Sequence, residues 1–141
     1  MSFVPKTGDT ESIGMAHGAS SGINAGEVVV FDRSNKIVIV GTAALLAEDN
    51  AGVAMEDAET TAGVVQVVPF RQGQLWEYDC TNNTAANQLC IRHLLTDAAT
   101  VANTSSDITT NVTTFTAIRN QGAASDKKQV GFVTYVPPTL S

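Results

Sequence analysis

Two strand-like segments joined by a polar turn occupy the C-terminal part of this 141-residue chain. The segments Thr113–Ile118 and Gln129–Val136 are rich in the β-branched and aromatic residues that strands favour. Between them, Asn120–Lys128 supplies the Asn, Gly, Ser and Asp residues that turns favour. The order strand, turn and strand predicts that the chain ends as part of a β-sheet. No catalytic residue set lies between the strands, so this ending is predicted to be architectural.

Segments with the residue pattern of β-strands begin at residue 27. Glu27–Phe31 and Lys36–Val40 are β-branched runs separated by a four-residue loop, Asp32–Asn35, which is the spacing of a β-hairpin. Asn35 is the loop residue expected to adopt a left-handed conformation. Because both runs are continuously apolar, we expect strands that are covered on both faces, as in a barrel or in a sheet packed on a partner.

Short strands are also predicted in the middle of the chain, at Gly52–Met55, Gly63–Val68, Gln74–Tyr78 and Leu89–Leu95. Pro69 ends one of them, because proline has no backbone N–H to donate to a ladder. Alternation along the third segment predicts that Trp76 and Tyr78 face the core. About eight short strands at intervals of about ten residues predict an all-β fold, a small β-barrel or β-sandwich.

Length and charge limit the classes of fold and partner. A chain of 141 residues fits one compact domain. Its formal net charge is −6 and its pI is about 4.6. Binding to nucleic acid is driven largely by the release of counterions when basic side chains neutralise the phosphates, so this acidic chain is not expected to bind nucleic acid.

The sequence predicts neither a membrane span nor a secretion signal. No apolar run approaches the roughly 20 residues needed to cross a bilayer, so no membrane partner is expected. Met1–Thr10 lacks the basic start and the apolar run of a signal peptide. We therefore expect synthesis in a cytoplasm. There Cys80 and Cys90 are predicted to stay free thiols, although a hairpin would allow them to face each other.

Residues Met1–Ala25 differ in pattern from the rest of the chain. They are polar, rich in Gly and Ser, and show neither helical nor strand periodicity. We interpret them as a flexible or extended N-terminal arm that orders on a neighbouring subunit. Removal of Met1–Ser21 is then expected to leave a folded domain that no longer adheres to the assembly to which the arm attaches it. The apolar residues expected to anchor the arm are Phe3, Val4, Pro5, Ile13 and Met15.

The predicted organisation therefore has three parts. The arm covers residues 1–25, a β-barrel or β-sandwich domain covers residues 26–136, and a short C-terminal tail covers residues 137–141. Pro137 and Pro138 stop the last strand before the tail.

One sequence pattern matches a nucleophile motif. Gly18–Gly22 fits G-x-S-x-G, with Ser20 as the nucleophile and His17 beside it. That motif requires a strand before the serine and a helix after it, whereas here it lies in the polar arm. His93, the other histidine, is interpreted as filling a half-buried slot in a strand. We therefore predict no catalytic residues and do not expect an enzyme.

The sequence also predicts no metal site and no cofactor. The histidines and cysteines do not have the spacing of a zinc site, and no glycine-rich phosphate-binding pattern occurs. The densest acidic segment lacks the alternate-position spacing of a calcium loop, so its side chains are expected to be solvated. Its members are Glu48, Asp49, Glu56, Asp57 and Glu59.

Several turn-and-strand features recur together between Ala25 and Val136. After the polar arm come Ala25–Val30, Gly52–Met55 and Gly63–Val67, and Gly122–Lys128 precedes the terminal strand. With these features the chain resembles the small β-rich decoration (cement) proteins of tailed-phage capsids.

The resemblance implies a non-enzymatic virion protein that is made in the host cytoplasm and binds the exterior of a phage capsid. Its implied partners are the major capsid protein and neighbouring copies of itself, as a homotrimer at threefold positions. There it would strengthen the shell against internal DNA pressure. The family has no catalytic residues to carry over to this chain.

Other functions stay open on the sequence. The chain length also suits a head–tail or tail component of a phage. A carbohydrate-binding β module would use exposed aromatic side chains such as Trp76 and Tyr78, and burial of Trp76 would argue against it. A small hydrolase would use Ser20 and a histidine, and loss of turnover in Ser20→Ala would support it.

Overall fold

The computed structural model describes residues 2–42, 50–104 and 112–136. Within these ranges the chain consists mainly of β-strands, so the all-β prediction is confirmed. The strands are β1 (Val4–Thr7), β2 (Ile13–His17), β3 (Val28–Asp32), β4 (Ile37–Val40), β5 (Asn50–Ala54), β6 (Gly63–Val68), β7 (Leu75–Cys80), β8 (Arg92–Leu95), β9 (Thr100–Ala102), β10 (Thr114–Gln121) and β11 (Lys128–Tyr135). Two single-turn 3-10 helices accompany them, η1 (Ala86–Gln88) and η2 (Ala124–Asp126). Strands β1, β2 and β9 were not predicted, because each is short and lies in a polar stretch.

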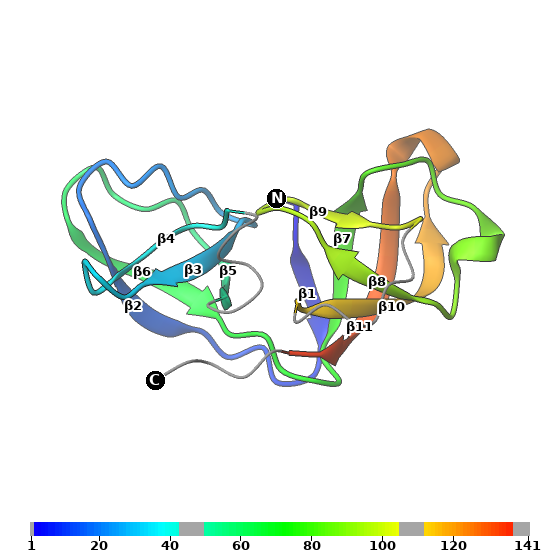
Figure 1. The fold of residues 1–141 in the computed structure, drawn as a ribbon, viewed down its shortest axis with the longest axis horizontal. Coiled ribbons are helices and arrows are strands. Elements are labelled where there is room, and N and C mark those ends of the chain that lie inside the picture. The colour runs from blue at the N-terminus through cyan, green and yellow to red at the C-terminus, as the bar shows by residue number, and fades with distance from the viewer. Residues whose placement is uncertain (1, 43–49, 105–111, 137–141) are drawn as a thin grey trace.

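The strands form two sheets that lie side by side (Figure 1). β2, β4, β3, β5 and β6 close into a barrel, and the second sheet has the strand order β1-β7-β11-β10-β8-β9. β9 also pairs in parallel with the C-terminal end of β7, so the second sheet curls until β9 lies against two strands. The predicted barrel is therefore present, together with a second sheet.

β3 and β4 form the predicted hairpin, with Phe31 opposite Val38. Val29 packs in the core of the barrel, whereas Val28 and Val30 pack in a larger core that includes side chains of the second sheet. All three valines are fully buried. The prediction that this strand is covered on both faces is confirmed.

The turn of this hairpin differs from the prediction by one residue. Lys36, with a φ of 60°, takes the left-handed conformation that was expected of Asn35. The Asn35 side chain instead donates a hydrogen bond of 2.8 Å to the Asp32 carboxylate. Its backbone N–H also donates to that carboxylate, over 3.3 Å. Asn35 therefore stabilises the turn through its side chain, a common use of Asp and Asn in turns.

β10 and β11 form the predicted C-terminal strand pair, with Phe115 opposite Val133. β11 lies inside the second sheet, between β10 and β7. Gly131 allows the side chain of Tyr78 to cross β11 closely. A Cβ atom at this position would lie 2.5 Å from the Tyr78 hydroxyl oxygen and 2.8 Å from the Thr116 carbonyl oxygen. The close approach of these atoms leaves room only for glycine.

The N-terminal segment is part of both sheets, so the prediction of a separate arm over residues 1–25 is wrong for the described residues 2–25. β1 pairs antiparallel with β7, where Val4 lies opposite Glu77. β2 pairs with β6 along its whole length and meets β4 on its other side. Strands of four and five residues that expose many of their side chains are too short to show periodicity in the sequence.

Phe3 lies at the centre of the larger hydrophobic core. Its side chain is 0% exposed. Its ring centroid lies 5.8 Å from that of Phe115 and 6.2 Å from that of Tyr78. The rings of Phe70 and Trp76 meet it edge-to-face at 6.3 and 6.4 Å. Aromatic pairs at these distances and angles stabilise a core beyond the effect of burial alone.

The core around Phe3 joins the two sheets. The backbone N–H of Phe3 donates a 3.1 Å hydrogen bond to the carbonyl of Gly26, at the entrance to β3. Barrel side chains belong to the same core, namely Val28, Val30, Val53 and Val68. The boundary predicted between residues 25 and 26 therefore does not separate two structural units. The tail predicted over residues 137–141 lies outside the described residues.

We expect Phe3→Ala to lower the free energy of unfolding by about 3–5 kcal/mol, because it removes the central ring and leaves a cavity between the sheets. Urea unfolding followed by the fluorescence of Trp76, the single tryptophan, measures this change. Phe132→Ala is the control, since 38% of the Phe132 surface is exposed, and it is expected to cost about 1 kcal/mol. Equal losses in the two variants would contradict the central role of Phe3.

Candidate functional site: the outer face of the second sheet

A row of side chains crosses four strands of the second sheet on the face that points away from the core. Leu75 of β7 lies beside Phe132 of β11, which in turn lies beside Thr116 of β10. Thr116 is opposite Arg92 of β8. Phe132 is 38% exposed, and Ile118 further along β10 is 40% exposed. We call these five residues the Phe132 face.

Polar contacts next to the row hold its side chains in place. The hydroxyl oxygens of Thr114 and Thr134 lie 3.1 Å apart, and Thr116 donates to Thr134 over 3.3 Å. Arg92 donates from Nε and Nη2 to the Thr114 hydroxyl, over 3.4 and 3.3 Å. The Arg92 guanidinium also lies 5.9 Å from the ring centroid of Tyr135. Because these groups are already ordered, a partner that binds here loses little side-chain entropy.

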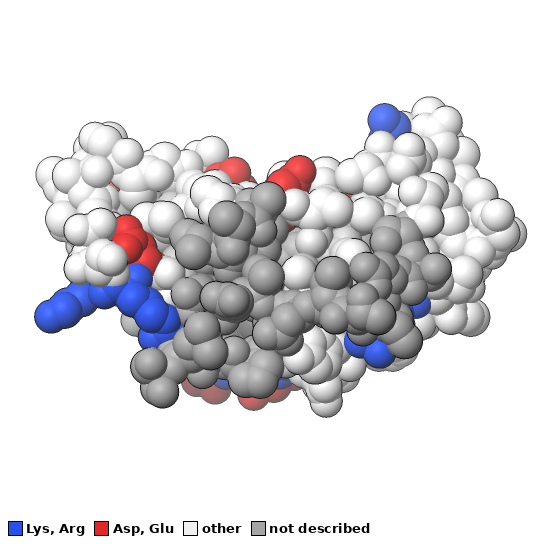
Figure 2. Space-filling model, in the orientation of Figure 1, with Lys and Arg blue, Asp and Glu red and all other residues white. Residues whose placement is uncertain are grey.

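Two ion pairs of the second sheet lie along β7, at positions after Leu75. Lys128 donates a 2.6 Å hydrogen bond to the Asp79 carboxylate, and this bond is the largest cause that raises the pKa of Lys128. The Lys6 ammonium lies 3.9 Å from a Glu77 carboxylate oxygen. In Figure 2 the second sheet, on the right, shows few charged side chains on the face seen. Arg92 is the charged member of the Phe132 face.

The residues predicted to anchor an arm lie in two separate places. Phe3 is fully buried, and Val4 and Pro5 are half-buried in β1 of the second sheet. Ile13, which is 47% exposed, and the half-buried Met15 lie on β2 of the barrel. The structure does not bring these five residues together in one exposed surface.

Two large aromatic side chains of β7 face inwards. Trp76 and Tyr78 are both 0% exposed, which confirms the prediction that they belong to the core. The alternative in which they form an exposed sugar-binding platform is wrong. Burial raises the pKa of Tyr78, and its hydroxyl has no hydrogen-bond partner among the described residues.

The G-x-S-x-G match lies in a loop. β2 ends at His17, and the described residues from Gly18 to β3 contain no helix. Ser20 is exposed with a φ of 53°, and its backbone N–H donates to the carbonyl of Thr60 over 2.8 Å. The His17 ring is buried, with Nδ1 2.8 Å from the Gly18 carbonyl oxygen. These residues do not form the strand, serine and helix order of a nucleophile elbow.

Two members of the acidic segment bind backbone groups. A Glu56 carboxylate oxygen accepts from the backbone N–H of Gln66 over 3.0 Å, and Asp57 accepts from that of Ala25 over 2.8 Å. Glu48 and Asp49 lie outside the described residues. In the described part of the chain, no three His, Cys, Asp or Glu side chains gather as metal ligands.

The described helices are single turns, and none is long and apolar enough to cross a membrane.

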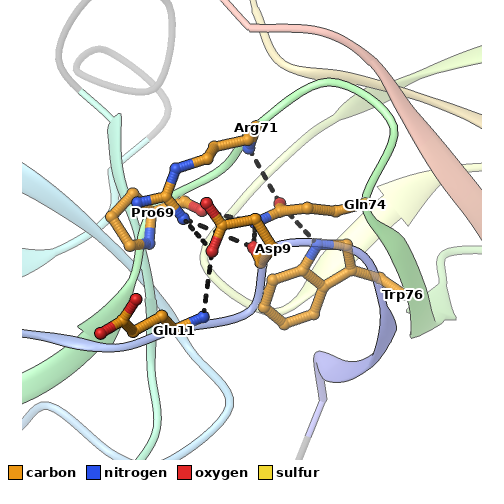
Figure 3. Close-up of polar contacts among 6 residues, drawn as sticks. All are labelled: Asp9, Glu11, Pro69, Arg71, Gln74 and Trp76. Atoms are coloured by element: carbon orange, nitrogen blue, oxygen red, sulfur yellow. Dashed lines mark hydrogen bonds and ion pairs between the residues drawn. The ribbon is translucent and has the colours of Figure 1, made fainter.

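Gln74 is a buried polar residue that the sequence did not single out. It holds the turn between β1 and β2 against the second sheet (Figure 3). Its Nε2 donates to the carbonyl oxygens of Asp9 and Pro69, over 2.6 and 2.8 Å. Its Oε1 accepts from the backbone N–H of Arg71 over 2.9 Å and from the indole N–H of Trp76 over 3.0 Å. Glutamine is usually exposed, so no sequence signal marks this role.

A second group of buried amides supports the loop between β7 and β8. Gln88 Oε1 accepts from the side-chain amides of Asn103, over 2.9 Å, and Gln129, over 3.0 Å. Cys80 donates through its sulfur to Gln129 Oε1 over 3.5 Å. Asn103 and Gln129 are fully buried. These groups are neutral and bonded to one another, so their arrangement is structural.

Comparison of the chain with protein-family models, with curated proteins and with solved structures finds no match in any of the three. The resemblance to decoration proteins therefore depends on the turn-and-strand pattern of the sequence alone.

We expect Gln74→Met to lower the free energy of unfolding by about 2–4 kcal/mol. The variant keeps the length of the side chain but leaves buried partners without hydrogen bonds, among them the indole N–H of Trp76. Gln72→Met, two residues away at an exposed position, is the control and is expected to change stability by about 0.5 kcal/mol or less. Urea unfolding measures both, and equal stability of the two variants would contradict the role of Gln74.

The two cysteines are both free, as predicted, and they differ in reactivity. Cys80 is buried, which raises its pKa to about 12, whereas Cys90 is exposed. Because the thiolate is the reacting species, Cys80 stays protonated at pH 8. We expect a thiol reagent at pH 8 to modify one cysteine of the folded protein and both in urea. Cys90→Ser should abolish the reaction of the folded form, and Cys80→Ser should leave it unchanged.

Proposed function

We propose that this protein is a non-enzymatic structural protein of a virion, which binds the outer surface of a phage capsid and stabilises the shell. Its partners are the major capsid protein and neighbouring copies of itself, arranged as a homotrimer at threefold positions. The proposal combines the resemblance found in the sequence with the surface of the second sheet.

The Phe132 face is the observation that carries the proposal. Phe132 and Ile118 are 38% and 40% exposed on the neighbouring strands β11 and β10. Hydrogen bonds between threonine hydroxyls order the sheet surface beside them. Exposed apolar side chains that gather on one face are typical of a protein–protein contact. Buried aromatic residues contribute most of the binding energy in such contacts.

The fold also suits a protein that is under mechanical stress. A single aromatic core around Phe3 joins the barrel to the second sheet, so force applied to one sheet is transmitted to the other. The net charge of −6 keeps free copies soluble and opposes contact with nucleic acid. Repetition of one contact over a symmetric shell multiplies a modest affinity per copy.

Sedimentation of the protein with expanded, undecorated capsids tests the proposal. The capsids are assembled from the major capsid protein that is encoded with this chain. Stoichiometric co-sedimentation, with the free protein behaving as a trimer, is the expected result. A folded protein that never sediments with capsids would overturn the shell-binding role.

Two variants test the assignment of the face. Phe132→Asp is expected to weaken capsid binding at least about tenfold, because it places a charge where an apolar ring is buried. Val64→Asp is the matched control, because Val64 lies on strand β6 of the barrel and is 60% exposed. It is expected to bind capsids as the unmodified protein does. Equal binding of both variants would refute the Phe132 face while leaving shell binding itself intact.

A further inference from the structure

The barrel is nearly open between β2 and β4. β2 pairs with β6 from Ile13 to His17, but it meets β4 at a single pair, His17 opposite Val38. β4 begins at Ile37, one residue before this pair, so the N-terminal part of β2 extends beyond the start of β4. Within the described chain, Gly14–Ala16 have ladder partners only on the β6 side. Their other edge therefore faces the opening with main-chain groups that a further strand is able to pair with.

A pocket of about 420 Å³ occupies this opening. Met15 and Ala16 of β2 form one wall, and Phe31, Ile37 and Val38 of the β3–β4 hairpin form the other. Most of these side chains are apolar and partly exposed. The pocket therefore has an apolar lining next to an unpaired strand edge.

Among the described residues that line the pocket, two are basic and one is acidic. Arg33 and Lys36 line it beside Asp32, and the Arg33 guanidinium lies 5.6 Å from the ring centroid of Phe31. The Asp32 carboxylate already accepts two hydrogen bonds from Asn35, which lower its pKa. Lys36 is exposed and has no ion pair with any described residue. Figure 2 shows basic side chains together at the left end of the molecule, where Figure 1 places this hairpin.

We propose that the opening between β2 and β4 is a binding site for an extended acidic peptide segment of a partner protein. The segment adds as a strand along the free edge of Gly14–Ala16. Alternate side chains of the segment then point in opposite directions, so that apolar residues enter the pocket and carboxylates meet Lys36 and Arg33. This inference does not depend on the shell-binding role, because it concerns the barrel and not the Phe132 face.

Each feature of the opening contributes to the choice of ligand. A free strand edge selects extended main chain, since both form the hydrogen bonds of a ladder. The basic side chains at the opening select carboxylates over ammonium groups. The rest of the surface instead attracts ammonium groups, because the chain has a net charge of −6. The apolar wall around Phe31 favours a peptide with apolar residues between its acidic ones over a fully charged one.

Titration of the ¹⁵N-labelled protein with a capped peptide of alternating valine and glutamate tests the site. We expect amide shifts to be concentrated in β2, in β4 and in the hairpin that joins β3 to β4. A peptide with lysine in place of glutamate is expected to bind at least about tenfold more weakly. Absence of binding by the glutamate peptide, or shifts confined to other strands, would overturn the proposal. Octanoate, an apolar chain with one carboxylate, serves as a small-molecule probe of the same pocket. Binding of octanoate without binding of the peptide would also overturn the proposal.

Two lysines form a matched pair of variants. Lys36 and Lys127 are both exposed and both left-handed, with φ values of 60° and 53°. Lys36→Glu and Lys127→Glu therefore change the net charge and the backbone strain by similar amounts. We expect Lys36→Glu to weaken binding of the glutamate peptide about tenfold and Lys127→Glu to change it by about twofold or less. Equal effects would show that overall charge alone attracts the peptide and would refute the site.

A third variant tests the pocket without changing charge. Ala16 is exposed on β2 and lines the pocket, so Ala16→Trp is expected to fill it and to abolish peptide binding. The amide spectrum itself reports whether the variant is folded. A folded Ala16→Trp variant that binds the peptide normally would contradict the proposed location.

Discussion

Burial of Phe3 is the interaction on which the rest of the structure depends. The ring touches aromatic side chains of the second sheet and lies in the same core as valines from the outside of the barrel. Its backbone N–H pairs with Gly26, and β1 follows directly along β7. This residue lies in the core that apolar side chains of both sheets share. The N-terminal segment is therefore a structural component of the domain, and Gln74 secures the turn at which it passes from the second sheet to the barrel.

The two sheets divide the surface into regions of different chemistry. The second sheet presents an ordered row around Phe132 with apolar and hydroxyl groups, which suits a broad protein–protein contact. The barrel presents a small opening with an unpaired strand edge and basic side chains at Arg33 and Lys36, which suits a narrow extended ligand. The shared core holds both sheets in one body, so the two regions proposed as binding sites belong to one structural unit.

Sequence patterns predicted the strands well where apolar residues are dense. The β3–β4 hairpin, the alternation around Trp76 and the C-terminal strand pair all follow from local runs that are long enough to show a period. The prediction failed at β1 and β2, where strands of four and five residues expose many of their side chains and the buried Phe3 lies just before β1. The anchoring residues of the predicted arm were accordingly assigned to a neighbour, whereas Phe3 fills the chain's own core.

The sequence by itself determined the all-β class, the strand positions in the apolar stretches and the acidic charge, because each depends on composition or on neighbours along the chain. Only the tertiary structure decided which apolar residues are exposed. Phe3 and Phe132 have the same side chain, yet one is fully buried and the other is not. The difference arises from strands far apart in sequence, since β1 pairs with β7 and β11 lies between β7 and β10. The opening between β2 and β4 likewise exists only because those strands meet at one pair.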